Sequence, residues 1–325
     1  MNPQARRALD LARQLAQRAA AFARRAIAWR PSEQQRERVR HAWDRVLVAI
    51  QQVTPTLALS TLMFRLTQSE NVRLKNFLIH GFLKLYDINL KEAEFERIGN
   101  YTSFNHFFTR ALKPNVRLLD PDPKMLLSPV DGRISQVGPI RNWSLLQAKG
   151  HDFTVEELIG SHGTARLFHN GSYCTIYLAP HNYHRIHMPA NGKLREWSYI
   201  PGKLYSVSAK NADRMPKLFV QNERICAVFD SDFGPLGLVM VGALFVGSLQ
   251  TSWAGRITPP HAQKPGVYSP MSPVILLRGR EMGRFNMGST VILLAPPRMV
   301  DWRPHLQPGR EVRMGLALGA MTRVK

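Results

Sequence analysis

The chain has 325 residues, enough for one large or two modest cores, and a net charge of +21. Its two cysteines, Cys174 and Cys226, lie far apart without a Cys-x-x-Cys pattern. This excludes a disulfide framework and a cysteine-based zinc site, and it favours a reducing compartment. The charge predicts an anionic partner, either nucleic acid or an acidic membrane surface.

Residues 1–45 carry eleven arginines against four acidic residues. Apolar residues recur there at helical spacing, namely Ala8, Leu11, Leu15, Ala19, Phe22 and Ala26. The pattern predicts an amphipathic helix lying on anionic lipid. An ordinary solvated helix packed on the protein and an arginine-rich transit peptide are the alternatives.

Residues 46–64 carry no charge, which is nearly the length of a membrane span. Polar residues and Pro55 interrupt the middle of the stretch, so we expect a shallow helix–break–helix at the membrane interface. A buried core helix fits the length equally well. No signal peptide is expected, because no short apolar run with a small-residue cleavage site opens the chain.

The chain up to about residue 115 has helical patterns, with helices expected at Val72–Leu85 and Leu90–Arg97. Beyond Lys113, short apolar runs separated by Gly and Pro predict strands. These runs are Cys174–Leu178, Leu218–Val220, Ile225–Phe229, Leu238–Val246, Val274–Leu277 and Val291–Leu294. The prediction is an α+β protein with an arginine-rich extension (1–45), a helical membrane-associating region (46–115) and a β-dominated catalytic domain (116–325).

The segment Gly288-Ser289-Thr290 precedes one of these apolar runs. A serine directly after a glycine can attack the peptide bond in front of it, because glycine has no Cβ to shield the carbonyl and tolerates strained backbone. Two histidines, His184 and His187, are spaced by three. The spacing could indicate a metal pair, but no nearby Cys or Glu pattern supplies a third ligand, so no metal is predicted. In an extended segment the two rings would point to opposite sides and could serve different steps.

Three blocks occur in order along the chain: Ser128-Pro129-Val130-Asp131-Gly132, Tyr177 to Pro189, and Arg284 to Thr290. Together they resemble phosphatidylserine decarboxylases, which are self-cleaving and make their own pyruvoyl cofactor. The resemblance runs from about Val46 to the C-terminus. It includes two departures, Met287 where the family usually has leucine and Gln250 where an acidic residue is common.

The resemblance implies that Ser289 is the nucleophile, that His187 is its base and that Asp131 orients the base, with His184 acting in decarboxylation. Local sequence alone makes Asp131 a turn residue, because Gly132 follows it. Cleavage after Gly288 would give a β chain of residues 1–288 and an α chain of residues 289–325, held as a heterodimer that could pair further. The pyruvoyl group formed from Ser289 would take phosphatidylserine as a Schiff base and yield phosphatidylethanolamine.

The resemblance also implies a peripheral protein at the cytoplasmic face of the cell membrane, with no nucleic acid as partner. One rival is a serine hydrolase using Ser289, His187 and Asp131, although the Gly-x-Ser-x-Gly elbow is absent. Another is a basic membrane- or nucleic-acid-binding protein without catalysis, although no helix-turn-helix, zinc-finger or RNP-type motif is present.

Overall fold

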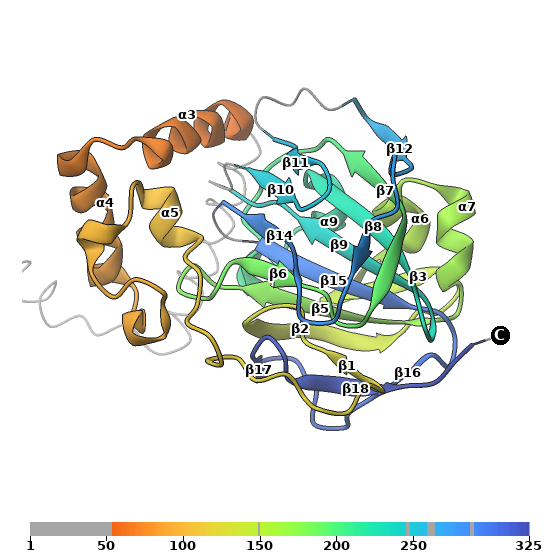
Figure 1. Ribbon diagram of the computed structural model, residues 1–325. Helices are drawn as coiled ribbons and strands as arrows, with labels where there is room; N and C mark the ends of the chain where they lie inside the picture. Colours follow the sequence, from red (N-terminus) through yellow and green to blue (C-terminus); the bar gives the residue numbers. More distant parts are fainter. Residues whose placement is uncertain (1–53, 149, 245–247, 259–263, 287–288, 325) are drawn as a thin grey trace, which may run out of the picture. The chain divides into compact units, whose positions relative to one another are not determined.

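The computed structural model describes residues 54–148, 150–244, 248–258, 264–286 and 289–324. They belong to one compact unit that runs from Ile50 to Lys325. The amphipathic helix expected in residues 1–45, and the part of 46–64 before residue 54, lie outside the described residues. Within the unit, helices come first and antiparallel sheets follow (Figure 1). This order confirms the predicted α+β class.

Three α-helices occupy the first part of the unit: α3 (Thr56–Gln68), α4 (Val72–Leu85) and α5 (Phe104–Phe108). α3 begins directly after Pro55, where the sequence predicted a break. The Asn71 side chain caps α4 by accepting from the backbone N–H groups of Arg73 and Leu74, both at 3.1 Å. The helix predicted at Val72–Leu85 is confirmed with the same bounds.

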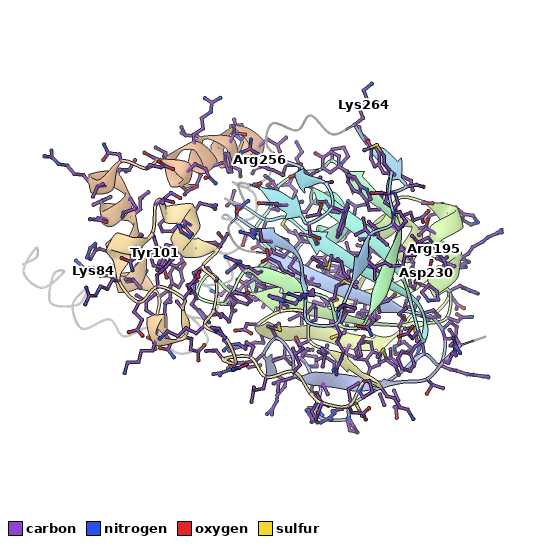
Figure 2. The ribbon with its side chains drawn as sticks, in the orientation of Figure 1. Lys84, Tyr101, Arg195, Asp230, Arg256 and Lys264 are labelled. Atoms are coloured by element: carbon purple, nitrogen blue, oxygen red, sulfur yellow. The ribbon has the colours of Figure 1, made fainter. Side chains whose placement is uncertain are left out.

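The helices share a small aromatic core of their own. Its buried members are Ile79, Tyr101, Phe104, Phe107 and Phe108. Tyr101 (Figure 2) donates its hydroxyl hydrogen to the Phe95 carbonyl at 2.5 Å, and its own carbonyl accepts from the buried Lys75 ammonium at 2.7 Å. The Arg256 guanidinium, also labelled in Figure 2, lies 5.3 Å from the ring centre of Phe64 on α3, so a side chain of the sheet region contacts the helical region.

The helix predicted at Leu90–Arg97 was wrong. Only Leu90–Glu92 (η1) forms a 3₁₀ turn, and a second turn covers Ile98–Asn100 (η2). Between them, Ala93 bridges Leu112 and the Glu94 N–H donates to the Ala111 carbonyl at 2.9 Å. Bonding to a distant segment therefore replaces the intrahelical bonds that helix-forming residues favour.

A nine-stranded antiparallel sheet forms the centre of the unit. Its strands in spatial order are β12 (Gly266–Tyr268), β7 (Gly192–Ile200), β8 (Arg224–Ser231), β9 (Gly234–Val241), β15 (Ser289–Ala295), β5 (Ser172–Leu178), β2 (Gly132–Pro139) and β17 (Glu311–Val312), with β13 (Ile275–Leu276) paired to β7. β15 lies between β9 and β5 (Figure 1), and all seven of its residues are buried. Burial on both faces explains why the predicted run Val291–Leu294 is continuously apolar instead of alternating.

Smaller sheets flank the central one. The first has the order β11 (Gly255–Arg256), β10 (Leu249–Thr251), β14 (Glu281–Phe285) and β6 (Arg185–His187). The second has β1 (Met125–Leu127), β18 (Ala317–Met321) and β16 (Val300–Trp302), and the third has β3 (Ser144–Ala148) and β4 (His151–Thr154). Short helical turns are α6 (Val155–Ile159), α7 (His162–Ala165), η3 (Arg166–Phe168), α8 (Ala209–Ala212) and α9 (Leu218–Gln221).

The predicted strands at Cys174–Leu178, Ile225–Phe229, Val274–Leu277 and Val291–Leu294 correspond to β5, β8, β13 and β15. Two others need correction. Leu218–Val220 lies in helix α9, because Lys217 takes a left-handed backbone conformation (φ 55°) and its carbonyl accepts from the Val220 and Gln221 N–H groups. The strand expected at Leu238–Val246 ends at Val241, after which Gly242 bonds to Asn222 and Glu223.

Candidate active site

Ser289 is the first residue of the central strand β15. It pairs with Leu178 of β5, whereas pairing with β9 begins one residue later at Thr290. The Ser289 and Thr290 hydroxyls are both buried and have no hydrogen-bond partner among the described residues. A buried hydroxyl without a partner is unfavourable, so two adjacent ones indicate a site under functional constraint. Gly288 lies outside the described residues.

Asn286, two residues before Gly288, is held from two directions. Its backbone N–H donates to the Ser248 carbonyl at 3.0 Å, and its side-chain oxygen accepts from the Asn105 amide at 3.0 Å. Asn105 belongs to helix α5, so the helical region and the loop before β10 both position the segment that leads to Ser289.

His184 is fully buried beside this segment. Its carbonyl accepts from the Phe285 N–H at 3.1 Å, and its ring centre lies 4.2 Å from that of Phe108. Because the Asn182 carbonyl, 2.8 Å from Nδ1, can only accept, the proton of the neutral ring is on Nδ1. Nε2 is therefore a lone-pair nitrogen, and it has no partner among the described residues. Burial lowers the pKa of His184 to about 3.

His187 ends strand β6, and both of its ring nitrogens are engaged. Nδ1 donates to the Gly279 carbonyl at 2.8 Å, and Nε2 accepts from the Tyr183 hydroxyl at 2.9 Å. Burial is the main cause that lowers the pKa of His187, and the bond to Gly279 and the charges of Glu281 and Asp131 oppose it. The segment is extended in the structure, and the rings of His184 and His187 have separate surroundings.

Asp131 is buried directly before β2. Its carboxylate accepts from Nε (3.1 Å) and Nη2 (2.6 Å) of Arg117 and from the Met314 backbone N–H (2.8 Å). Burial lowers the pKa of Arg117, but the hydrogen bonds and charges of Asp131 and Glu92 outweigh it and raise the pKa above its ordinary value.

The structure thus brings His184 to the segment before Ser289, and it does not join Asp131 to His187 by a hydrogen bond among the described residues. The Gly279 carbonyl selects the tautomer of His187, a task that the sequence argument gave to Asp131. Sequence reasoning missed Arg117, Tyr183 and Gly279. Only Tyr183 carried a signal, since it lies inside the histidine block.

Comparisons with known proteins identify the family of this chain. A family model described as phosphatidylserine decarboxylase matches residues 104–320, and a second model, described as PSD, matches residues 46–87. Among curated proteins, the phosphatidylserine decarboxylase proenzyme of Nitrosococcus oceani is 47% identical over 281 residues, which cover 86% of this chain and 92% of that protein. Proenzymes of the same name from Marinobacter nauticus and Azotobacter vinelandii are each 45% identical over 86% and 85% of this chain, and 98% of each relative is covered. The chain belongs to the phosphatidylserine decarboxylase family.

Proposed function

We propose that Ser289 is the residue through which this phosphatidylserine decarboxylase proenzyme cuts its own backbone and forms its pyruvoyl group. The observation that carries the proposal is the Ser289 hydroxyl directly after Gly288, at the start of the central strand, which is buried and has no hydrogen-bond partner among the described residues. Backbone pairing to β5 fixes Ser289, so the hydroxyl can attack without first ordering its own chain.

The cleavage balances with atoms of the chain and one water. Ser289 Oγ attacks the Gly288 carbonyl carbon and the amide nitrogen leaves that carbon, so an ester replaces the amide. Loss of the Cα proton of residue 289 then expels the Gly288 carboxylate and leaves dehydroalanine. The enamine becomes an imine, and water hydrolyses it to the pyruvoyl carbonyl with release of ammonia. The α chain that results has 37 residues.

Within this proposal, His187 takes the proton from the Ser289 hydroxyl through Nε2. Two features support the assignment: Gly279 fixes the tautomer that leaves a lone pair on Nε2, and the charge of Asp131 favours the protonated ring. Nε2 must exchange the Tyr183 hydroxyl for that of Ser289 to act, so Tyr183 serves as its resting partner.

His184 is proposed to act in the second reaction. Its Nε2 is buried, carries a lone pair and has no partner among the described residues, so it can accept a hydrogen bond or a proton from the reacting group. The hydroxyl of Thr290 offers a further hydrogen bond beside residue 289, and these unpartnered polar atoms fit a small polar group such as pyruvoyl. That group supplies an electron sink for the carbanion left when carbon dioxide departs.

Mass analysis tests the proposal. Purified protein should consist of two fragments of 288 and 37 residues, with the smaller one blocked at its N-terminus. Ser289→Ala should remain a single inactive chain. An uncut protein that decarboxylates phosphatidylserine would contradict the cleavage, and an uncut protein that hydrolyses esters would favour the serine hydrolase alternative.

We further propose that α3 and α4 carry the surface that meets the cytoplasmic face of the membrane. Large apolar side chains are exposed on or beside these helices, namely Leu57, Leu62, Leu66, Val72, Phe77 and Leu85. Arg65, Arg73 and Lys84 lie on the same helices and would attract anionic lipid. Among the described residues no helix is long and apolar enough to cross a membrane, so the contact is proposed to be peripheral.

A further inference from the structure

Arg110 follows α5 and is a buried cation whose donors are mostly unused. The residue is only 5% exposed to solvent. Nη2 donates to the His181 carbonyl at 3.1 Å, but Nε and Nη1 are buried without a hydrogen-bond partner among the described residues. No ion pair to an acidic side chain within the described ranges accompanies it. A buried charge in this condition is costly to the fold.

Arg224 gives a matched comparison, because it is buried to a similar degree. All three of its nitrogens donate to backbone carbonyls, with Nε bonding to Leu158 at 2.7 Å and Nη1 bonding to Val220 at 2.7 Å. Nη2 donates to Glu157. Arg224 therefore has a complete structural role, whereas two of the three Arg110 nitrogens have no such role.

The surroundings of Arg110 belong to the candidate active site. Its guanidinium carbon lies 5.9 Å from the ring centre of Phe107, and its bond to His181 ties it to the loop that carries His184. The charge of Arg110 also contributes to the lowered pKa of His184, which places the two side chains within electrostatic reach. The Asn105 side-chain oxygen on α5, like His184 Nε2, lacks a donor among the described residues.

We propose that Arg110 binds the phosphodiester of the substrate phospholipid. The inference rests on the proposed function, and it names the part of the substrate that this cation recognises. The substrate has two anionic groups, the carboxylate and the phosphodiester. A cation at the carboxylate would stabilise the reactant more than the transition state, because the carboxylate loses its charge as carbon dioxide leaves. The phosphodiester keeps its charge throughout, so Arg110 can hold it without slowing the reaction.

Both free nitrogens are covered by protein atoms in this structure. A ligand reaches them only when α5 or the loop around His181 shifts. Because α5 packs with the helices proposed to meet the membrane, binding of these helices to lipid would produce that shift. The buried charge then gains its counter-ion from the headgroup.

The experiment uses cleaved, pyruvoyl-containing enzyme with dihexanoylphosphatidylserine as the substrate. Arg110→Met keeps much of the side-chain volume and removes the charge, and Arg110→Lys keeps the charge but has different donors. Arg224→Met is the matched control. For each protein we would measure cleavage, kcat, KM and the melting temperature. Inhibition by glycerophosphoethanolamine and by inorganic phosphate distinguishes the lipid headgroup from a free phosphate.

For Arg110→Met we expect normal cleavage, a kcat within a few-fold of wild type and a KM raised about 10- to 100-fold, as for one or two hydrogen bonds to a charged group. The KM of Arg110→Lys should lie between those of the wild type and Arg110→Met. The melting temperature should drop by no more than about 2–4 °C, the effect of losing the single bond to His181. Inhibition by glycerophosphoethanolamine should weaken in parallel with the rise in KM.

An unchanged KM with a melting temperature lowered as far as in Arg224→Met would overturn the proposal and make Arg110 structural. A loss confined to kcat would also overturn it, because Arg110 would then act in the chemical step and not in binding the phosphodiester. Equal inhibition by inorganic phosphate and glycerophosphoethanolamine would remove the headgroup assignment. Wild-type enzyme that is cleaved but does not decarboxylate phosphatidylserine would instead contradict the proposed function.

Discussion

Replacing Arg117 with alanine should be among the most destabilising single changes near the site. The Arg117 and Asp131 side chains are each only 8% exposed, and their closest atoms are 2.6 Å apart. The variant would leave the Asp131 carboxylate buried with only the Met314 N–H as donor. Removing one partner of such a pair typically costs about 3–5 kcal/mol, and two unit charges 4 Å apart in an effective dielectric of about 20 interact by about 4 kcal/mol. We therefore expect a loss of about 3–5 kcal/mol.

Urea unfolding in the Ser289→Ala background measures this loss on one uncut polypeptide. Arg133→Ala is the control, because Arg133 pairs with Glu311 on the surface and both side chains are mostly exposed, so about 1 kcal/mol or less is expected. The double variant Arg117→Ala/Asp131→Asn should regain part of the stability, since it removes the unpaired charge. A loss for Arg117→Ala no larger than that for Arg133→Ala, or a double variant no more stable than Arg117→Ala alone, would refute the reasoning.

Three further predictions concern catalysis, pH and membrane binding. His187→Ala should remain uncut, whereas His184→Ala should be cleaved yet lose decarboxylation, as gel and activity assays would reveal; two fully processed, active variants would contradict both roles. Because burial lowers the pKa of His184 from 6.5 to about 3, the unfolded chain binds more protons between these values. The free energy of unfolding should therefore be highest above about pH 6.5 and should fall by up to about 1.4 kcal/mol per pH unit as the pH decreases. Urea unfolding of His184→Gln should show a weaker dependence of this free energy on pH, and an unchanged dependence would contradict the role of the buried ring. Phe77 and Leu85 are 75% and 78% exposed, so changing both to serine should leave the melting temperature nearly unchanged but reduce vesicle co-sedimentation at least tenfold, and equal binding would exclude this surface.

Local pattern predicted the elements that local forces dominate. The α4 helix has its own cap at Asn71. The apolar run Val291–Leu294 is buried on both faces only if it forms an inner strand of a sheet. The predictions at Leu90–Arg97 and Leu218–Val220 were wrong because partners from elsewhere decided the backbone conformation. Ala93 bridges Leu112, and the Leu218 N–H donates to the distant Gln147 side chain, information that a window of neighbouring residues does not contain.

In the candidate site, too, some features could be inferred from the local sequence and others could not. The roles proposed for Ser289, His184 and His187 could be inferred from the sequence, because a candidate nucleophile or base is recognisable from its residue type and its motif. Their supporting contacts were not predictable. The tautomer of His187 depends on a backbone carbonyl 92 positions away, and a carbonyl has no signature in the sequence. Arg110 could not be singled out from the sequence either, because its Nε and Nη1 are seen to lack a partner among the described residues only in the folded chain.

The position of β15 has a consequence for the order of events in the life of the protein. The proposed 37-residue α chain supplies the inner strand of the nine-stranded sheet, and its β17 and β18 pair with β2 and β1 of the larger fragment. If this strand were inserted after cleavage, the facing edges of β9 and β5 would have to remain without a hydrogen-bonded neighbour until then. The polypeptide must therefore complete its fold before it is cut, and two fragments produced separately should not assemble into active enzyme. Conversely, once the cut is made, backbone pairing to β5 over all seven residues of β15 and to β9 over Thr290–Leu294 keeps the short chain in place without any covalent link.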